Sequence, residues 1–347
     1  MLSPDSLAKG QHVMAVCNAC RYCEAYCPVF PAMEQRTSFA KGDLLYLSNL
    51  CHNCGECLYA CQYAPPHEFG INVPRTLAEI RLGSYEEYCW PSFMSGMFRR
   101  SGVGLSLAIS AIAMVVVFVF ARSSSTPGDF YGVIPHDLMV GIFGLAGTLV
   151  VLSLTIGFAR ALNSVVVPRF KWRAVRDALT LRHLHDTGED CTRAIEVRTP
   201  WRRYFHHCTF YGFALCMAST TVAAIYHTFF EWRAPYAYTS LPVVLGTIGG
   251  AGLIVGPLGL LAQYRRRDAQ LKDSSQQGLD VSFIVMLLLT SITGLLLLLL
   301  RGSDVMPALL VVHLGFVLGL FVTLPYGKFV HGIYRTAALL KFASERR

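Results

Sequence analysis

Eight of the twelve cysteines of this 347-residue chain form two groups of four near the N-terminus. Both groups have the spacing C-x2-C-x2-C-x3-C. The positions are Cys17, Cys20, Cys23 and Cys27, then Cys51, Cys54, Cys57 and Cys61. In bacterial proteins this run binds [4Fe–4S] clusters in pairs. The two groups therefore predict two such clusters, which transfer one electron at a time.

The spacing also predicts which cysteines share a cluster. Three cysteines separated by two residues wrap a tight loop around one cubane, and the fourth points to the partner cluster, as in two-cluster ferredoxins. We therefore expect the sets Cys17, Cys20, Cys23 and Cys61, and Cys51, Cys54, Cys57 and Cys27. Pro28 follows Cys27 whereas Gln62 follows Cys61, but that proline shapes the backbone and is not a ligand.

Two other uses of cysteine are disfavoured. Structural zinc also binds four cysteines, but typically from two separated C-x2-C pairs rather than from two full groups of equal spacing. A disulfide framework would normally follow a signal peptide, and residues 1–10 contain no apolar segment of that kind. Cysteines that stay in the cytosol remain reduced and available as thiolates, the form that metals bind.

Five histidines lie in or at the ends of two long apolar segments. They are His206, His207, His227, His313 and His331. Ionisable side chains inside a membrane are costly and usually functional, and two facing imidazoles can supply both axial ligands of a haem iron. We therefore expect one or two b-type haems, with an inner pair of His206 or His207 with His331 and an outer pair of His227 with His313. The alternative is that these histidines only form hydrogen bonds between helices or at helix ends.

Helical phase refines these pairs. If residues 307–331 form one continuous helix, His313 and His331 are 18 residues apart and face the same way. By the same measure His206 shares a face with His227 better than His207 does, unless the helix bends near residue 207. His136 is interpreted as an interfacial residue. The sequence contains no C-x-x-C-H run, so covalently attached haem is not expected.

The segments that must position these groups are long and apolar. Hydrophobic residues make up 53% of the chain, charged residues 15%, and the mean hydropathy is +0.43. Six segments have about the 20 residues that an α-helix needs to cross a bilayer. They are residues 103–121, 136–159, 206–230, 242–263, 281–300 and 307–331. The sequence thus predicts a ferredoxin-like domain with two clusters over residues 1–99, then an all-α membrane domain of six transmembrane helices over residues 100–347.

Positive charge is distributed unevenly between the connecting loops. The net charge is +8, and Lys and Arg concentrate in residues 160–205, 264–280 and 332–347. Each loop on the opposite side contains a single arginine and no lysine. Loops rich in positive charge stay cytoplasmic. We therefore expect a multi-pass inner-membrane protein with both termini in the cytoplasm, and no role in binding nucleic acid.

Other features have structural interpretations. Six glycines between residues 246 and 259 indicate close packing of the fourth helix. In the cytoplasmic loop 160–205, His183, His185 and Cys191 are interpreted as polar loop residues rather than as a metal site. No role is assigned to the remaining cysteines, Cys89, Cys191, Cys208 and Cys216.

Long runs in the membrane segment resemble a known family. They include His206-His207-Cys-Thr-Phe-Tyr211-Gly212, Tyr226-His227, Ala234-Pro235-Tyr236, Ser240-Leu-Pro-Val and Pro325-Tyr-Gly-Lys328-Phe-Val-His331-Gly. Together with the cysteine groups, they make the whole chain similar to the tricarballylate-utilisation protein B family, also called the CitB-type citrate-utilisation protein B family. The stretch from His313 to His331 is also similar, over a shorter length, to the haem-binding helix of the nitrate reductase gamma subunit.

The resemblance implies a role that residue spacing does not supply. Proteins of this family reoxidise the reduced flavin of a soluble FAD-dependent tricarballylate dehydrogenase and pass the electrons through iron–sulfur clusters and haem to the quinone pool. No G-x-G-x-x-G run opens a nucleotide site, so we expect a redox subunit without a substrate dehydrogenase site of its own. The alternatives are a subunit of another dehydrogenase or reductase, of the heterodisulfide- or nitrate-reductase type, and an iron–sulfur-regulated transporter or redox sensor.

Overall fold

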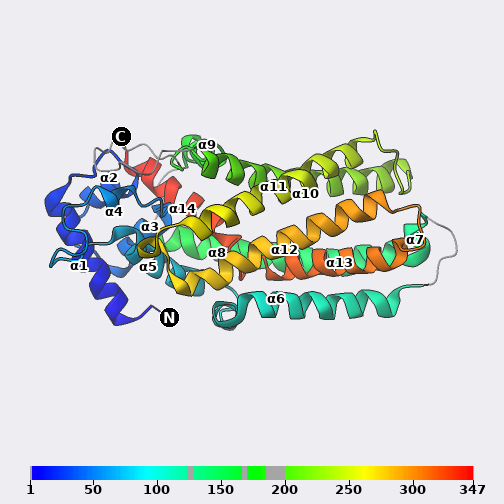
Figure 1. Cartoon of the computed structure of the whole chain (residues 1–347), viewed down its shortest axis with the longest axis horizontal. Coiled ribbons are helices and arrows are strands. Elements are labelled where there is room, and N and C mark those ends of the chain that lie inside the picture. The colour runs from blue at the N-terminus through cyan, green and yellow to red at the C-terminus, as the bar shows by residue number, and fades with distance from the viewer. Residues whose placement is uncertain (1, 123–127, 166–169, 185–199, 347) are drawn as a thin grey trace.

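The computed structural model describes residues 2–122, 128–165, 170–184 and 200–346, whose regular structure is helical throughout (Figure 1). The cysteine-rich part contains α1 (Pro4–Cys20), α2 (Val29–Glu34), α3 (Lys41–Leu50), α4 (Glu56–Tyr59) and α5 (Val73–Tyr88). The long helices are α6 (Phe93–Phe120), α8 (His136–Val165), α10 (Trp201–Phe230), α11 (Leu241–Arg266), α12 (Ser274–Leu299) and α13 (Met306–Thr323). The remaining elements are α7 (Phe130–Val133), α9 (Trp172–Leu179), η1 (Ala269–Leu271) and α14 (Val330–Glu345).

The six predicted membrane segments are confirmed as six helices that are long and apolar enough to cross a membrane. They run along the length of the molecule beyond the cysteine-rich end (Figure 1). In the most apolar stretch of each helix, between 6% and 39% of the residues are buried inside the protein. Most of these apolar side chains therefore face outward, which is the arrangement of a multi-pass membrane protein.

The sixth predicted segment, residues 307–331, is interrupted. Helix α13 ends at Thr323, and residues 324–329 form turns before α14 begins at Val330. Pro325 lies at this interruption, and a proline cannot donate the backbone hydrogen bond that would continue the helix. His313 and His331 consequently lie on two different helices. The prediction that one continuous helix turns both the same way is wrong.

Helices α10 and α11 pack closely along a seam of glycines. A Cβ atom at Gly249 would lie 2.8 Å from the backbone oxygen of Gly212, and one at Gly256 would lie 2.7 Å from that of Phe205. Real Cβ atoms do not approach so closely, so only glycine permits this contact. The predicted close packing of the fourth membrane helix is confirmed. Among the described helices α10 contacts chiefly α11.

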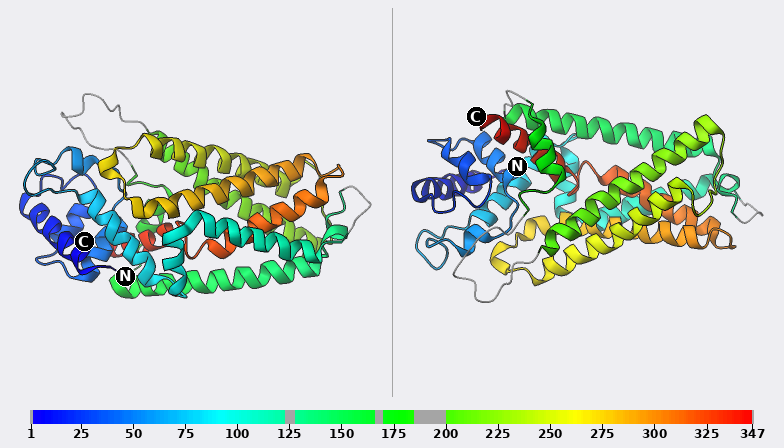
Figure 2. Two further views of the ribbon diagram at one scale, coloured as in Figure 1. Left: turned by 60° about the horizontal axis from the view of Figure 1, so that its bottom comes forward. Right: turned by 90° about the horizontal axis from the view of Figure 1, so that it is seen from above.

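The cysteine-rich part and the membrane helices share a hydrophobic core at the end where both termini lie (Figure 2). Helix α14 turns back from the bundle and packs against α3, α8 and α9. Its Tyr334 and Ala338 belong to the same buried cluster as Leu44 of α3 and Val165 of α8. Near the end of α14, the Glu345 carboxylate lies 2.7 Å from the Arg36 guanidinium. A boundary after residue 99 thus divides the sequence but not the packed core.

Candidate functional site

The turn conformations of the cysteine groups explain how the chain brings their sulfurs together. Helix α1 carries Cys17 and Cys20 in its last turn and ends at Arg21, whose φ of 55° reverses the chain. In the second group, Gly55 has a φ of 98°, in the left-handed region that favours glycine. A Cβ there would also lie 2.6 Å from the side chain of Leu271, so the turn needs glycine on both grounds.

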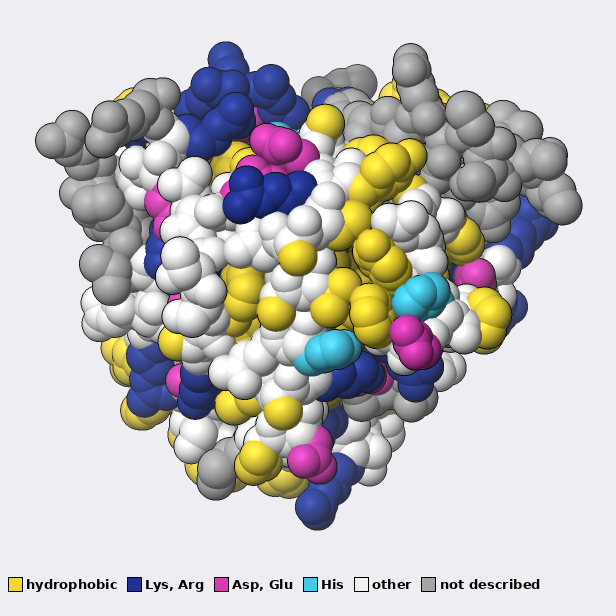
Figure 3. Space-filling view, turned by 90° about the vertical axis from the view of Figure 1, so that its left-hand side faces the viewer, with side chains coloured by type: hydrophobic (Ala, Val, Ile, Leu, Met, Phe, Trp, Pro, Cys, Tyr) yellow, Lys and Arg dark blue, Asp and Glu magenta, His cyan; other side chains and the backbone are white. Residues whose placement is uncertain are grey.

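The first set of thiols gathers three cysteines of the first group and one of the second. Burial and the neighbouring thiols of Cys61, Cys23 and Cys20 raise the pKa of Cys17 to about 12. The four side chains are half-buried. They belong to the end of the molecule where hydrophobic side chains lie exposed among charged ones (Figure 3).

The second set combines Cys51, Cys54 and Cys57 of the second group with Cys27 of the first. Burial and the thiols of Cys54 and Cys51 raise the pKa of Cys27 well above its ordinary value. A small cavity is bounded by Cys27, Cys51, Cys54 and Cys57. Hydrogen bonds from the backbone N–H groups of Val29 and Glu56 to Cys27 and Cys54 favour the thiolate form. Cys23 of the first group also lies near Cys27 and Cys57, so the two sets adjoin each other.

Within the described ranges, no three His, Cys, Asp or Glu side chains lie close enough to bind one metal ion. A zinc ion needs its four sulfurs about 2.3 Å from one centre. A cubane spreads its four thiolates over four irons, so the sulfurs lie farther apart. Each set supplies the four thiols that a cubane takes, one for each iron.

Four arginines from separate parts of the chain surround the loop Cys51–Asn53, which begins with the first cysteine of the second group. All four donate hydrogen bonds to backbone carbonyls of this loop. The distance is 2.6 Å from Arg81 Nη1 to Cys51 O and 3.1 Å from Arg202 Nη2 to His52 O. Together we call them the arginine collar: Arg81 of α5, Arg202 of α10, Arg267 after α11, and Arg335 of α14.

His52 belongs to the Cys51–Asn53 loop and contacts the arginine collar. Arg335 Nη1 donates to His52 Nδ1 at 2.6 Å, while Arg335 Nη2 donates to Cys51 O at 2.5 Å. Burial and the guanidinium groups of Arg335 and Arg202 lower the pKa of His52 well below its ordinary value, so its imidazole is neutral at pH 7. Its Nε2 is buried and has no hydrogen-bond partner among the described residues.

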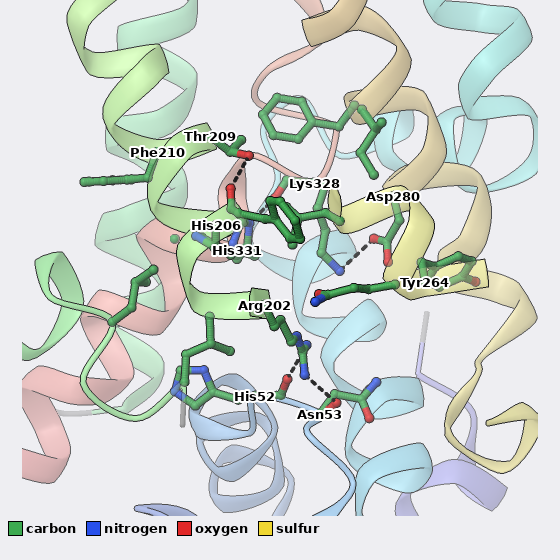
Figure 4. Close-up of a pocket in the computed structure, with 18 of the residues that line it drawn as sticks. His52, Asn53, Arg202, His206, Thr209, Phe210, Tyr264, Asp280, Lys328 and His331 are labelled. Carbon is green, nitrogen blue, oxygen red and sulfur yellow. Dashed lines mark hydrogen bonds and ion pairs between the residues drawn. The ribbon is translucent and has the colours of Figure 1, made fainter. Parts of the chain in front are cut away.

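A cavity of about 1370 Å³ begins at the Cys51–Asn53 loop and extends between the membrane helices. It is larger than most small-molecule sites, which are roughly 300–1,000 Å³. The loop end is polar because the arginine collar lines it, whereas Phe213, Phe283 and Phe329 line the apolar part. His206 and His331 lie between these two regions (Figure 4).

The structure brings His206 and His331 together across this cavity. Their ring centres are 5.9 Å apart with an interplanar angle of 74°. His331 Nδ1 lies 2.5 Å from the carbonyl oxygen of Lys328, so that nitrogen is the donor and Nε2 is left as the free ligand. The Nδ1 of His206 is buried without a partner among the residues described. His207 instead packs against Tyr211, with ring centres 5.6 Å apart.

The two rings of the expected outer pair have different neighbours. His227 stacks on His136, with ring centres 3.6 Å apart. His313 Nδ1 lies 3.1 Å from the hydroxyl of Thr293 on α12. In the part of the chain that the structure describes, no ring contact joins His227 to His313. The geometry therefore favours the inner pair as a metal site and gives no such support to the outer pair.

The sequence interpretation missed His52 and the arginine collar. Two members of the collar did carry a signal, because Arg202 precedes His206 by four residues and Arg335 follows His331 by four. Residues four apart share a face of a helix. Each helix that supplies an inner histidine therefore also presents an arginine one turn away. No comparable pattern marks Arg81 or Arg267.

Several other sequence features can now be placed. His183 lies 3.8 Å from an oxygen of Asp177, while His185 and Cys191 lie outside the described residues. Cys89 is buried, and its carbonyl accepts a hydrogen bond from Arg160 at 2.6 Å. Cys208 and Cys216 lie on α10 at the glycine seam.

Comparison with known proteins matches both the membrane part and the cysteine-rich part of the chain. The chain matches the family described as Citrate utilization protein B over residues 96–347. Residues 10–87 match the Citrate utilization protein B Fer4-like domain, which contains both cysteine groups. The chain is also 49% identical to the Citrate utilization protein B of Escherichia coli, over 98% of this chain and 93% of that protein. No solved structure matches it significantly. With both parts matched, the chain belongs to the citrate utilization protein B family.

Proposed function

We propose that this protein reoxidises the reduced flavin of a soluble FAD-dependent tricarballylate dehydrogenase and delivers the electrons, through two [4Fe–4S] clusters and b-type haem, to the quinone pool. One observation carries the proposal. His52 and Cys54 line both the small cavity of the second cysteine set and the large cavity that contains His206 and His331. The candidate cluster site and the candidate haem site therefore adjoin each other, as electron transfer requires.

The assignment of the clusters follows the two sets of neighbouring thiols. We assign one cluster to Cys17, Cys20, Cys23 and Cys61, and the other to Cys51, Cys54, Cys57 and Cys27. When bound, the clusters and the haem accept and release single electrons. The protein holds the sulfurs in place through the turns at Arg21 and Gly55, and backbone N–H groups stabilise the thiolates.

The inner histidines fit a haem iron. Metal–imidazole bonds of about 2 Å on opposite sides of one ion place two ring centres roughly 6 Å apart. The rings of His206 and His331 are 5.9 Å apart. Lys328 O fixes the tautomer of His331, and Phe213, Phe283 and Phe329 exclude water from the apolar part of the cavity. We propose a single haem at this pair, because the ring of His227 stacks on His136 and His313 contacts Thr293, with no ring contact between His227 and His313 among the described residues.

We propose that the end bearing both termini faces the cytoplasm. Arg265 and Arg266 in the last turn of α11 and Arg267 directly after it lie at this end, in agreement with the positive-inside rule. The first cysteine set belongs to the same end, where Tyr22 is 66% and Phe69 43% exposed (Figure 3). A soluble flavoprotein could approach the first cluster there, while lipid-soluble quinone would reach the membrane helices.

The test uses the full-length protein purified anaerobically in detergent. We expect about eight irons in clusters with matching acid-labile sulfide, four for each cubane, and a pyridine haemochrome spectrum of haem b. In vesicles that also receive tricarballylate dehydrogenase and its substrate, quinone reduction should require this protein. A preparation with neither iron nor labile sulfide would contradict the proposal.

A further inference from the structure

The arginine collar contains more positive charge than its described surroundings neutralise. No carboxylate among the described residues forms an ion pair with Arg81, Arg202, Arg267 or Arg335. Two carboxylates line the cavity in the described part of the chain: Asp280 pairs with Lys328 at 2.7 Å, and Asp268 accepts hydrogen bonds from the Tyr59 hydroxyl and the Gln270 backbone N–H. Burial and the neighbouring guanidinium groups lower the pKa of Arg267 to about 10. Buried charges of one sign are unfavourable without a counter-charge.

The second cluster can neutralise only part of this charge. A [4Fe–4S] cluster with four thiolates carries roughly two negative charges in its oxidised form. Against four guanidinium groups, about two positive charges remain. They lie at the polar end of the large cavity, beside the space between His206 and His331.

Unused donors face the same region. Arg202 uses Nη1 and Nη2 on the carbonyls of Asn53 and His52, which leaves its Nε. Arg267 uses Nη2 on Asn53, which leaves Nε and Nη1. Arg81 is only 6% exposed, and its buried Nε has no hydrogen-bond partner among the described residues. The cavity therefore offers guanidinium N–H groups to an anion.

The position of these donors relative to the histidines is defined by helix geometry. Arg202 lies one turn of α10 before His206, and Arg335 lies one turn of α14 after His331. Both arginines bind the Cys51–Asn53 loop, so both lie on the cluster side of the histidines. Figure 4 shows Arg202 between His206 and the His52–Asn53 backbone. A tetrapyrrole held by His206 and His331 would therefore have one edge directed toward the arginine collar.

We propose that Arg202 and Arg267 bind the carboxylates of a tetrapyrrole held by His206 and His331, and so orient its carboxylate edge toward the Cys51–Asn53 loop. This inference rests on the haem of the proposed function. Two carboxylates supply negative charge, and the remaining N–H groups of Arg202 and Arg267 can donate charge-assisted hydrogen bonds to them. The same arginines would then contact both the cluster loop and the tetrapyrrole.

The test compares two ligands in the full-length protein, purified without haem from haem-deficient cells. The ligands are protohaem IX and its dimethyl ester, in which both carboxylates are neutral. Charge-assisted hydrogen bonds predict that the protein binds protohaem at least about tenfold more tightly than the ester. The double variant Arg202→Gln, Arg267→Gln should bind both ligands alike, with the affinity that the unchanged protein shows for the ester.

The matched control is Arg203→Gln, since Arg203 donates instead to Thr180 O at 2.8 Å. This control should keep the preference for protohaem, and the EPR signals of the clusters should persist in every variant. If the unchanged protein binds both ligands equally, or if the double variant keeps the preference, the inference is overturned. If clusters assemble but neither ligand binds, the haem assignment itself fails. Should the double variant not fold, the comparison of ligands in the unchanged protein still decides.

Discussion

At the scale of single residues, the adjacent histidines of α10 have different surroundings. One residue along a helix rotates a side chain by about 100°, so His206 and His207 cannot both face the cavity. His206 faces His331, whereas His207 packs on Tyr211. His331 also has its Nδ1 engaged by Lys328 O, which leaves Nε2 for a metal. The two neighbours are therefore expected to respond differently to substitution.

Replacing His331 with Ala should remove the haem b signal and leave the cluster signals intact. The substitution removes a proposed haem ligand but changes no cysteine. His207→Ala is the control and should retain haem. Both variants are compared by pyridine haemochrome absorbance and by EPR of the reduced clusters. Full haem occupancy in the His331→Ala protein would refute the assignment of the inner pair.

At the scale of elements, the interruption between α13 and α14 positions half of the site. The turns at residues 324–329 allow α14 to leave the bundle and pack against the cysteine-rich part. As a result His331 faces the cavity while Arg335, one turn later, reaches the second cysteine loop. A continuous sixth helix would carry these residues away from the loop.

The glycine seam between α10 and α11 fixes the other half of the site, since α10 carries His206 and Arg202. A Cβ at Gly256 would lie 2.6 Å from the backbone nitrogen of Thr209 and 2.7 Å from the oxygen of Phe205. Gly256→Ala should therefore force the helices apart and destabilise the protein by about 1–3 kcal/mol. We expect a lower melting temperature in detergent and weaker haem retention.

The control for this substitution is Gly104→Ala on α6, where an added Cβ meets no atom within 4 Å. Alanine favours the helical conformation over glycine, so this variant should melt at the same temperature or slightly higher. Equal melting temperatures for the Gly256→Ala and unchanged proteins would show that the seam tolerates a larger spacing than the structure indicates.

At the scale of the whole molecule, one core joins the cysteine-rich part to the membrane helices. Residues of α1, α3, α5, α8 and α14 contribute to the same buried cluster. The two cysteine sets are therefore held rigidly relative to His206 and His331 rather than on a mobile arm. Electron transfer falls off steeply with distance, and such a fixed arrangement suits it.

The orientation of the molecule gives a prediction of its own. A green fluorescent protein fused after Arg347 should fluoresce, and alkaline phosphatase fused within residues 301–306 should be active, because the first needs the cytoplasm and the second the opposite side. The reciprocal fusions, with the two reporters exchanged, serve as controls. An active phosphatase at the C-terminus would reverse the proposed topology.

The sequence alone determined the features that depend on local spacing. Cysteine spacing predicted an iron–sulfur domain, and the lengths of the apolar segments predicted six membrane helices, because ligand loops and bilayer-spanning helices impose short-range patterns. Glycines 246–259 likewise indicated the packing of α11. The sequence also named His331 and, by helical phase, favoured His206 over His207 without excluding His207.

Only the tertiary structure decided which distant residues meet. The stacking of His227 on His136 and the arginine collar arise from contacts between segments far apart in the chain. The break at residues 324–329 does have a local signal in Pro325, which the prediction of one continuous helix did not use. No spacing in the sequence marks Arg81 or Arg267, since sequence alone does not distinguish a buried arginine from an exposed one. What distinguishes them is the loop that they bind and the cavity beside it, and these exist only once α5, α10, α11 and α14 have packed together.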